Sequence, residues 1–205
     1  MKNGASRSDW RDGFLFVGNE LALDFVNTRP AQDGEPTELL KDFEALLRWF
    51  QAADALSARE TNRLRRQWSG TARAERVTEA MRELREKLRK DVLAWERGAA
   101  IRRTTVEKLD RLLAEHPMRT RLRADEKGYS KEMWFEVREP EDLFAPLVYS
   151  AANLFTEVDR ERVRKCAKCV LHFHDTSKKG TRRWCSMQMC GNRAKVAAYA
   201  ARQRA

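Results

Sequence analysis

The chain has 205 residues, with 41 Lys or Arg and 31 Asp or Glu, and its formal net charge at pH 7 is +10. Its first residues contain no apolar stretch resembling a signal peptide, so we expect a cytoplasmic protein with no membrane partner. No Gly-rich phosphate loop and no nucleophile–base pair can be named, and we therefore expect no enzyme activity and no catalytic residue.

Three polar residues recur at helical spacing in an apolar segment near the N-terminus. Asp24, Asn27 and Thr28 stand three and four residues apart, which places them near one face of a helix. They would either line a ligand pocket or hydrogen-bond to the backbone and cap a helix, and the sequence leaves both interpretations open. The preceding run 14–17 is ambiguous between helix and strand.

The remainder of residues 1–159 is dominated by helical periodicity. Apolar residues at three- and four-residue steps predict helices over 39–50, over 77–95 with an end at Gly98, and over 143–158. Pro146 is compatible with the last of these if it lies in the first turn.

Two further helices are predicted from their start signals. Ser57-x-x-Glu60 and Thr104-x-x-Glu107 each fit a capping box, in which the first side chain and the carboxylate three residues later bond reciprocally to the backbone. The second of these helices should stop near Pro117.

One segment of this region has strand character instead. Residues 119–124 and 131–137 flank a polar, glycine-containing stretch, which predicts a β-hairpin. Residues 1–159 are therefore expected to form a mostly helical domain, and the expected fold class is mainly α with a small β-hairpin. If the chain is a regulator, this would be its regulatory domain and could sense a ligand.

The only four cysteines of the chain form two close pairs in its last 40 residues: Cys166-x2-Cys169 and Cys185-x4-Cys190. A Cys-x-x-Cys pair forms a tight knuckle that aims two thiolates at one point, and a second pair completes a tetrahedron around zinc. Four thiolates leave no open position for a reacting water. We predict one structural Zn²⁺.

Other uses of these residues are conceivable. An iron–sulfur cluster could take the same four ligands, and two disulfides would suit a secreted protein. His172 or His174 could replace one cysteine, although their spacing fits better with two residues on the same side of a short strand.

The positive charge of the protein is concentrated around these cysteines. Residues 160–205 contain thirteen Lys or Arg and two acids, which leaves residues 1–159 with a net charge of about −1. A compact surface with so many cations most often binds nucleic acid phosphates. The alternatives are a merely soluble basic tail and membrane-surface binding, which would need an apolar stripe.

The order of local signals in residues 160–205 indicates a treble-clef-like zinc finger. Residues 175–183 read as a turn, and we predict that 171–174 and 182–184 pair as a small hairpin with Trp184 packed under the knuckles. The alanine-rich run after Cys190 predicts a helix.

Residues 175–196, with Cys190-Gly191-Asn192-Arg193, strongly resemble the CGNR zinc finger. Upstream, residues 18–28 are similar to the opening motif of the ABATE-type domain that usually precedes that finger. The resemblance spans nearly the whole chain and implies a bacterial, stress-induced transcription regulator that binds DNA. The first knuckle is shorter than in many relatives, but it keeps both ligands.

Eight residues of the finger are candidates for DNA contact. The cations lie on the turn and the final helix, where Lys195 and Arg202 share a face. Asn192 would either cap the helix or read a base edge, and Arg193 would either brace the fold or bind phosphate. The set is Lys178, Lys179, Arg182, Arg183, Asn192, Arg193, Lys195 and Arg202.

These features together predict a transcriptional regulator that binds double-stranded DNA at the nucleoid through a zinc-stabilised basic module. The alternatives are an RNA- or ribosome-associated zinc module and a protein–protein adaptor with an acidic partner. Few aromatic residues lie near the turn, which argues against stacking on single strands. A homodimer and a small-molecule effector would both suit such a regulator, but the sequence specifies neither.

Overall fold

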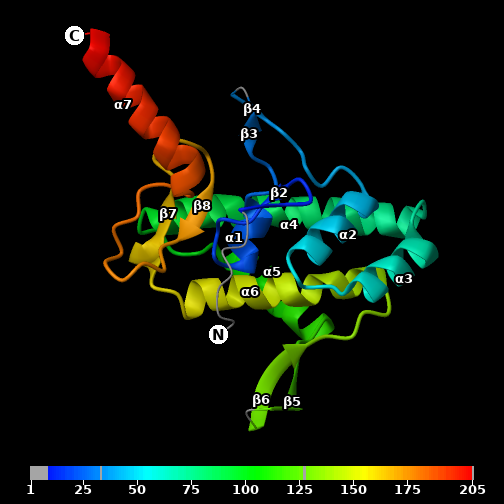
Figure 1. Ribbon diagram of the computed structural model, residues 1–205. Helices are drawn as coiled ribbons and strands as arrows, with labels where there is room; N and C mark the ends of the chain where they lie inside the picture. The colour runs from blue at the N-terminus through cyan, green and yellow to red at the C-terminus, as the bar shows by residue number, and fades with distance from the viewer. Residues whose placement is uncertain (1–8, 33, 127, 205) are drawn as a thin grey trace.

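The computed structural model describes residues 9–32, 34–126 and 128–204, and most of them lie in helices (Figure 1). The mainly α fold expected from the sequence is confirmed. The helices are α1 Leu21–Val26, α2 Phe43–Ala52, α3 Ala58–Trp68, α4 Ala72–Glu96, α5 Arg103–Glu115, α6 Phe144–Thr156 and α7 Asn192–Arg204.

Within the described residues the strands form four antiparallel pairs, each of which makes its own small sheet. The pairs are β1 Trp10–Arg11 with β2 Phe14–Leu15, β3 Ala31–Gln32 with β4 Glu35–Pro36, β5 Arg119–Asp125 with β6 Gly128–Trp134, and β7 Val163–Lys165 with β8 His172–His174.

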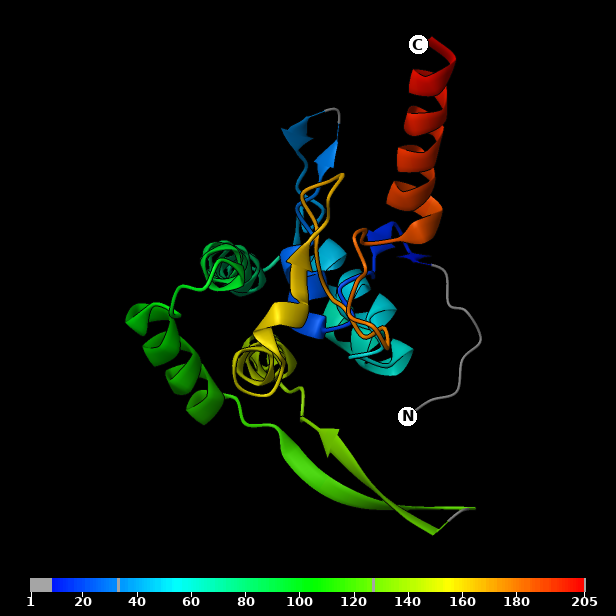
Figure 2. The ribbon, with the colours of Figure 1, turned by 90° about the vertical axis from the view of Figure 1, so that its left-hand side faces the viewer.

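The short helix α1 lies at the centre of the helical body. It packs against α4 and α6, which run nearly parallel and are both seen end-on in Figure 2. Leu23, Phe25 and Val26 of α1 are fully buried, because this helix is covered on nearly all sides. The apolar residues of α4 that recur every three or four positions face the same core.

Helix ends follow local chemistry more closely than the apolar periodicity suggests. The helix predicted over 39–50 begins only at Phe43, because the Asp42 side chain accepts a hydrogen bond from the Ala45 N–H (2.8 Å) and fixes the N-terminus there. The end near Gly98 is confirmed, and this glycine has φ +94°, a left-handed conformation that stops a helix.

One of the two predicted capping boxes is confirmed and the other is wrong. Ser57 and Glu60 bond reciprocally at the start of α3. The helix expected to start at Thr104 begins earlier, after Arg102, with no side-chain cap. The Arg102 guanidinium donates to buried Asp91 of α4 (2.7 Å), and this tertiary contact sets the start of α5.

The predicted hairpin over 119–137 is confirmed as β5–β6, which projects from the body as an arm (Figure 1). At the start of α6, Pro146 occupies the first turn, where its missing N–H costs no hydrogen bond. No helix in the described part of the chain is long and apolar enough to cross a membrane.

The hairpin predicted between 171–174 and 182–184 is wrong. β8 pairs with β7 instead, and residues 182–184 belong to a loop folded around Asp175. Asp175 is buried and accepts hydrogen bonds from the backbone N–H groups of Ser177 (3.0 Å) and Arg182 (2.7 Å). This Asx-type contact turns the chain away from the strand.

Candidate metal centre

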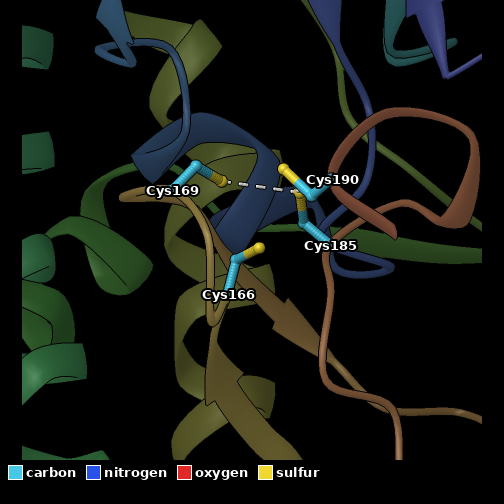
Figure 3. A group of neighbouring side chains, drawn as sticks. All are labelled: Cys166, Cys169, Cys185 and Cys190. Atoms are coloured by element: carbon cyan, nitrogen blue, oxygen red, sulfur yellow. Dashed lines mark hydrogen bonds between the residues drawn. The ribbon is translucent and has the colours of Figure 1, made fainter. Parts of the chain in front are cut away.

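The four cysteines converge on one point (Figure 3). Their Sγ atoms all lie within 4.8 Å of one another, with 3.6 Å between Cys169 and Cys185 and 3.7 Å between Cys185 and Cys190. Sulfurs placed tetrahedrally at roughly 2.3 Å from zinc are about 3.8 Å apart. The donor set and its spacing therefore fit Zn²⁺, and the chain binds one structural zinc.

The hydrogen bonds around the cysteines favour ionisation of Cys166 over its neighbours. Hydrogen bonds from the Cys169 and Cys185 thiols, and from the backbone N–H groups of Cys185 and Lys168, lower the pKa of Cys166. Cys169 is affected in the opposite sense: the hydrogen bond that its thiol makes to Cys166 raises the pKa of Cys169 to about 12. Four sulfurs this close repel one another when ionised, so a divalent cation is what allows all four to be thiolates.

Neither histidine enters the cluster. Both lie on β8, as the predicted short strand requires, and both face carboxylates of the helical body. His172 is 1% exposed with Nδ1 3.5 Å from Glu96 Oε2, and His174 Nδ1 lies 3.0 Å from Glu20 Oε1.

The zinc module shares its core with the N-terminal segment. Leu15 and Val17 are buried in the same cluster as the cysteines, Leu171 and Phe173. Trp184 packs against this cluster, as the sequence suggested. The Ser186 hydroxyl donates to Asp9, and its oxygen accepts from the Met189 N–H, which caps the π-helical turn Met187–Gly191 ahead of α7.

The edge of β8 that does not pair with β7 is hydrogen-bonded to residues 18–27. Asn27 makes two bonds to the His172 backbone: its Nδ2 donates to the carbonyl (2.8 Å) and its Oδ1 accepts from the N–H (2.9 Å). The His174 N–H donates to the Gly18 carbonyl (2.8 Å), and Asn19 Nδ2 donates to the His174 carbonyl (2.7 Å). The Asn27 side chain thus makes the two backbone hydrogen bonds that a neighbouring strand would otherwise make to His172.

The polar residues considered as a ligand pocket are all buried and hydrogen-bonded within the protein. Asp24 Oδ1 accepts from the Gly18 N–H (2.7 Å), and Thr28 Oγ1 donates to the Phe25 carbonyl (2.7 Å) and accepts from Arg85. Burial raises the pKa of Asp24 to about 7. With Asn27 holding β8, the geometry supports a structural role for this face of α1.

Two family models match the chain. Residues 162–203 match the CGNR zinc finger, and residues 19–158 match ABATE, a family described as "Putative stress-induced transcription regulator". The chain belongs to the ABATE family. A search of curated proteins finds no match.

In this ABATE protein the basic turn, residues 175–183, is largely exposed, and two arginines of the preceding segment hold its backbone. Lys178, Lys179 and Arg183 are exposed, and the Arg183 guanidinium lies over the Trp184 ring. Two arginines not singled out from the sequence hold the turn: Arg162 donates to the Asp175 and Ser177 carbonyls, and Arg164 donates to the Gly180 carbonyl. Inside a long basic run, no sequence signal separates such braces from free cations.

Arg182 has a different position from the rest of the predicted DNA-contact set. Its guanidinium donates to the carbonyls of Trp184 and Cys185 and lies 4.6 Å from the centre of the Phe173 ring. These contacts fix the second knuckle beside a metal ligand, so the side chain stabilises the module and is only half-exposed.

Helix α7 stands away from the ABATE body in both ribbon views (Figures 1 and 2). It packs chiefly against the turn 187–191. The remaining predicted contacts lie on it with exposed side chains: Asn192, Arg193, Lys195 and Arg202. Asn192 is its first residue, and the cap of the preceding turn is Ser186. A Cβ at Gly191 would meet Met187 Sδ at 2.4 Å, but that atom belongs to the flexible end of a side chain that can move aside.

Proposed function

We propose that this protein is a transcription regulator whose zinc module binds double-stranded DNA. The observation that carries the proposal is an acid-free basic segment: from residue 176 onward the sequence has eight Lys or Arg and no Asp or Glu. The exposed turn and the projecting helix α7 display most of these cations. The family description supports a role in transcription.

The shape of α7 suits a groove of duplex DNA. Thirteen helical residues span about 20 Å, and a B-DNA major groove of roughly 12 Å width admits one α-helix. Arg193, Lys195 and Arg202 are exposed on α7. The A-form major groove of RNA is deep and narrow, which favours DNA over RNA as the partner.

In this proposal zinc contributes structure rather than chemistry. Cys185 and Cys190 anchor the turn from which α7 starts, and the braced basic turn lies between the two knuckles. In so small a module the metal-binding free energy is largely folding free energy. Removing zinc should therefore release both α7 and the basic turn from their positions.

The test is a fluorescence-anisotropy titration of zinc-loaded and chelator-treated protein at two salt concentrations. Duplex DNA, duplex RNA and single-stranded DNA of equal length are compared. We expect tightest binding to duplex DNA, a steep loss of affinity with salt, and loss of binding after chelation. Equal affinity for chelated protein would refute the zinc-dependent mechanism, and a preference for RNA would replace DNA as the proposed partner.

A further inference from the structure

A large open cleft lies on the ABATE body between α3, α6 and the base of the β5–β6 arm. Its volume is about 1000 Å³, at the upper end of the usual range for small-molecule sites. It is separate from Asp24, Asn27 and Thr28, whose side chains are committed to internal hydrogen bonds.

One wall of the cleft is a row of arginines on α3. Arg59, Arg63 and Arg66 follow spacings of four and three, so they share a helix face over about 10 Å. Arg63 donates to the Val137 carbonyl, whereas the guanidinium groups of Arg59 and Arg66 have no hydrogen bond or ion pair with another described residue. Guanidinium groups bind phosphate oxygens in a bidentate manner.

Three of the five acidic residues that line the cleft are paired with arginines, and the other two bond to a histidine ring and to a serine cap. The pairs are Glu20 with His174, Asp54 with Arg11, Glu60 with the Ser57 cap, Glu132 with Arg121, and Glu136 with Arg138. A hydrogen bond to serine leaves the charge of Glu60 in place, so the α3 wall carries three arginines and one carboxylate, a net charge of +2.

The opposite walls offer flat rings. Tyr149 and Asn153 lie half-buried on one face of α6. Trp134 on β6 is half-buried too, but the Arg119 and Arg121 guanidinium groups already lie over its ring, at 5.9 and 5.3 Å from the ring centre. Aromatic faces of this kind stack on planar rings. We propose that the cleft binds a small phosphorylated ligand of the nucleotide class, with its phosphates on the α3 arginines and its ring against Tyr149.

Two residues that line the cleft also hold strand β8 of the zinc module. Asn19 and Glu20 line it, and the same two side chains bond to the carbonyl and the ring of His174 on β8. A ligand that orders these residues stabilises the docked zinc module. The regulatory meaning of this link rests on the proposed DNA-binding function, whereas the binding site itself does not.

Isothermal titration calorimetry of the full zinc-loaded chain with adenosine, pyrophosphate, ADP and ATP tests the site. We expect ADP and ATP to bind at least tenfold more tightly than either fragment. Arg59→Gln/Arg66→Gln should weaken ATP binding at least tenfold. The control pair Lys41→Gln/Arg76→Gln changes the same charge at exposed positions outside the cleft and should leave binding within twofold.

A second variant separates the cleft from the basic zinc module. If Lys178→Gln/Lys179→Gln, rather than the α3 pair, abolishes ATP binding, the nucleotide is only an anion on the DNA surface and the proposal is overturned. Absence of binding by every probe overturns it as well. Saturating ATP should slow zinc extraction by a chromogenic chelator about fivefold or more, and an unchanged rate would remove the link to β8. None of these readouts requires DNA.

Discussion

Replacing Asn27 with alanine tests whether the helical body holds the zinc module in place. Asn27 and His172 are each 1% exposed, and the amide makes two hydrogen bonds of 2.8 and 2.9 Å to the His172 backbone. The substitution orphans a buried N–H and a buried carbonyl, at about 1–3 kcal/mol each. We expect a total loss of about 3 kcal/mol, since β8 keeps its pairing with β7.

Thermal unfolding of the zinc-loaded protein, followed by circular dichroism, measures this loss. For a chain of this size 1 kcal/mol corresponds to about 2–4 °C, so the melting temperature should fall by about 10 °C. Zinc extraction by a chelator should also accelerate, because β8 directly follows the Cys169 knuckle.

The matched control is Asn62→Ala, which removes the same amide from an exposed position on α3. Its effect should stay within about 0.5 kcal/mol. If Asn27→Ala is no more destabilising than this control, or if its zinc is lost no faster than that of the wild type, the docking account is wrong.

Three further changes test other contacts of the account. Burial raises the pKa of Asp24 to about 7 from 3.8, so the folded state holds a proton that the unfolded chain releases. Stability should then fall, on the order of 3 kcal/mol, as pH rises from about 4 to about 7. Asp24→Asn keeps the acceptor for Gly18 and should reduce this dependence in urea unfolding; an unchanged pH profile would contradict the assignment. Gly18→Ala should destabilise the protein far more than Gly191→Ala. The first Cβ meets the Asp24 backbone N at 2.8 Å, whereas the second meets the flexible end of a methionine; similar melting temperatures would argue against this. Arg182→Gln should accelerate zinc loss, because its guanidinium braces the Trp184 and Cys185 carbonyls; wild-type zinc retention with weakened DNA binding would return it to the DNA-contact set.

Features that depend on nearby residues could be predicted from the sequence. The cysteine spacing was sufficient to predict a cluster, because two short knuckles restrict where four sulfurs can lie. The Ser57 capping box is likewise complete within four residues. The Thr104 signal had the same pattern, but the Arg102–Asp91 contact between α5 and α4 displaced the helix start.

Features that depend on distant partners could not be predicted. β8 was assigned the wrong partner because its outer edge is occupied by Asn27 and Gly18, which lie about 150 residues earlier in the chain. Only the polarity of Asn27 within an apolar motif indicated a special role, and nothing in the sequence pointed to the His172 backbone as its partner. Arg162, Arg164 and Arg182 look like free cations in a basic run, and only the carbonyls they reach in the fold reveal their structural use.

The measurement that tests the central claim most directly is the salt dependence of duplex-DNA affinity for paired charge variants. Each phosphate contact contributes roughly −0.9 to the slope of log K against log salt concentration. We predict that Lys178→Gln/Lys179→Gln and Lys195→Gln/Arg202→Gln each make the slope shallower by about 2. The exposed control pair Lys41→Gln/Arg76→Gln should leave it unchanged. Identical slopes for all three variants and the wild type would show that the zinc module does not contact DNA through this surface.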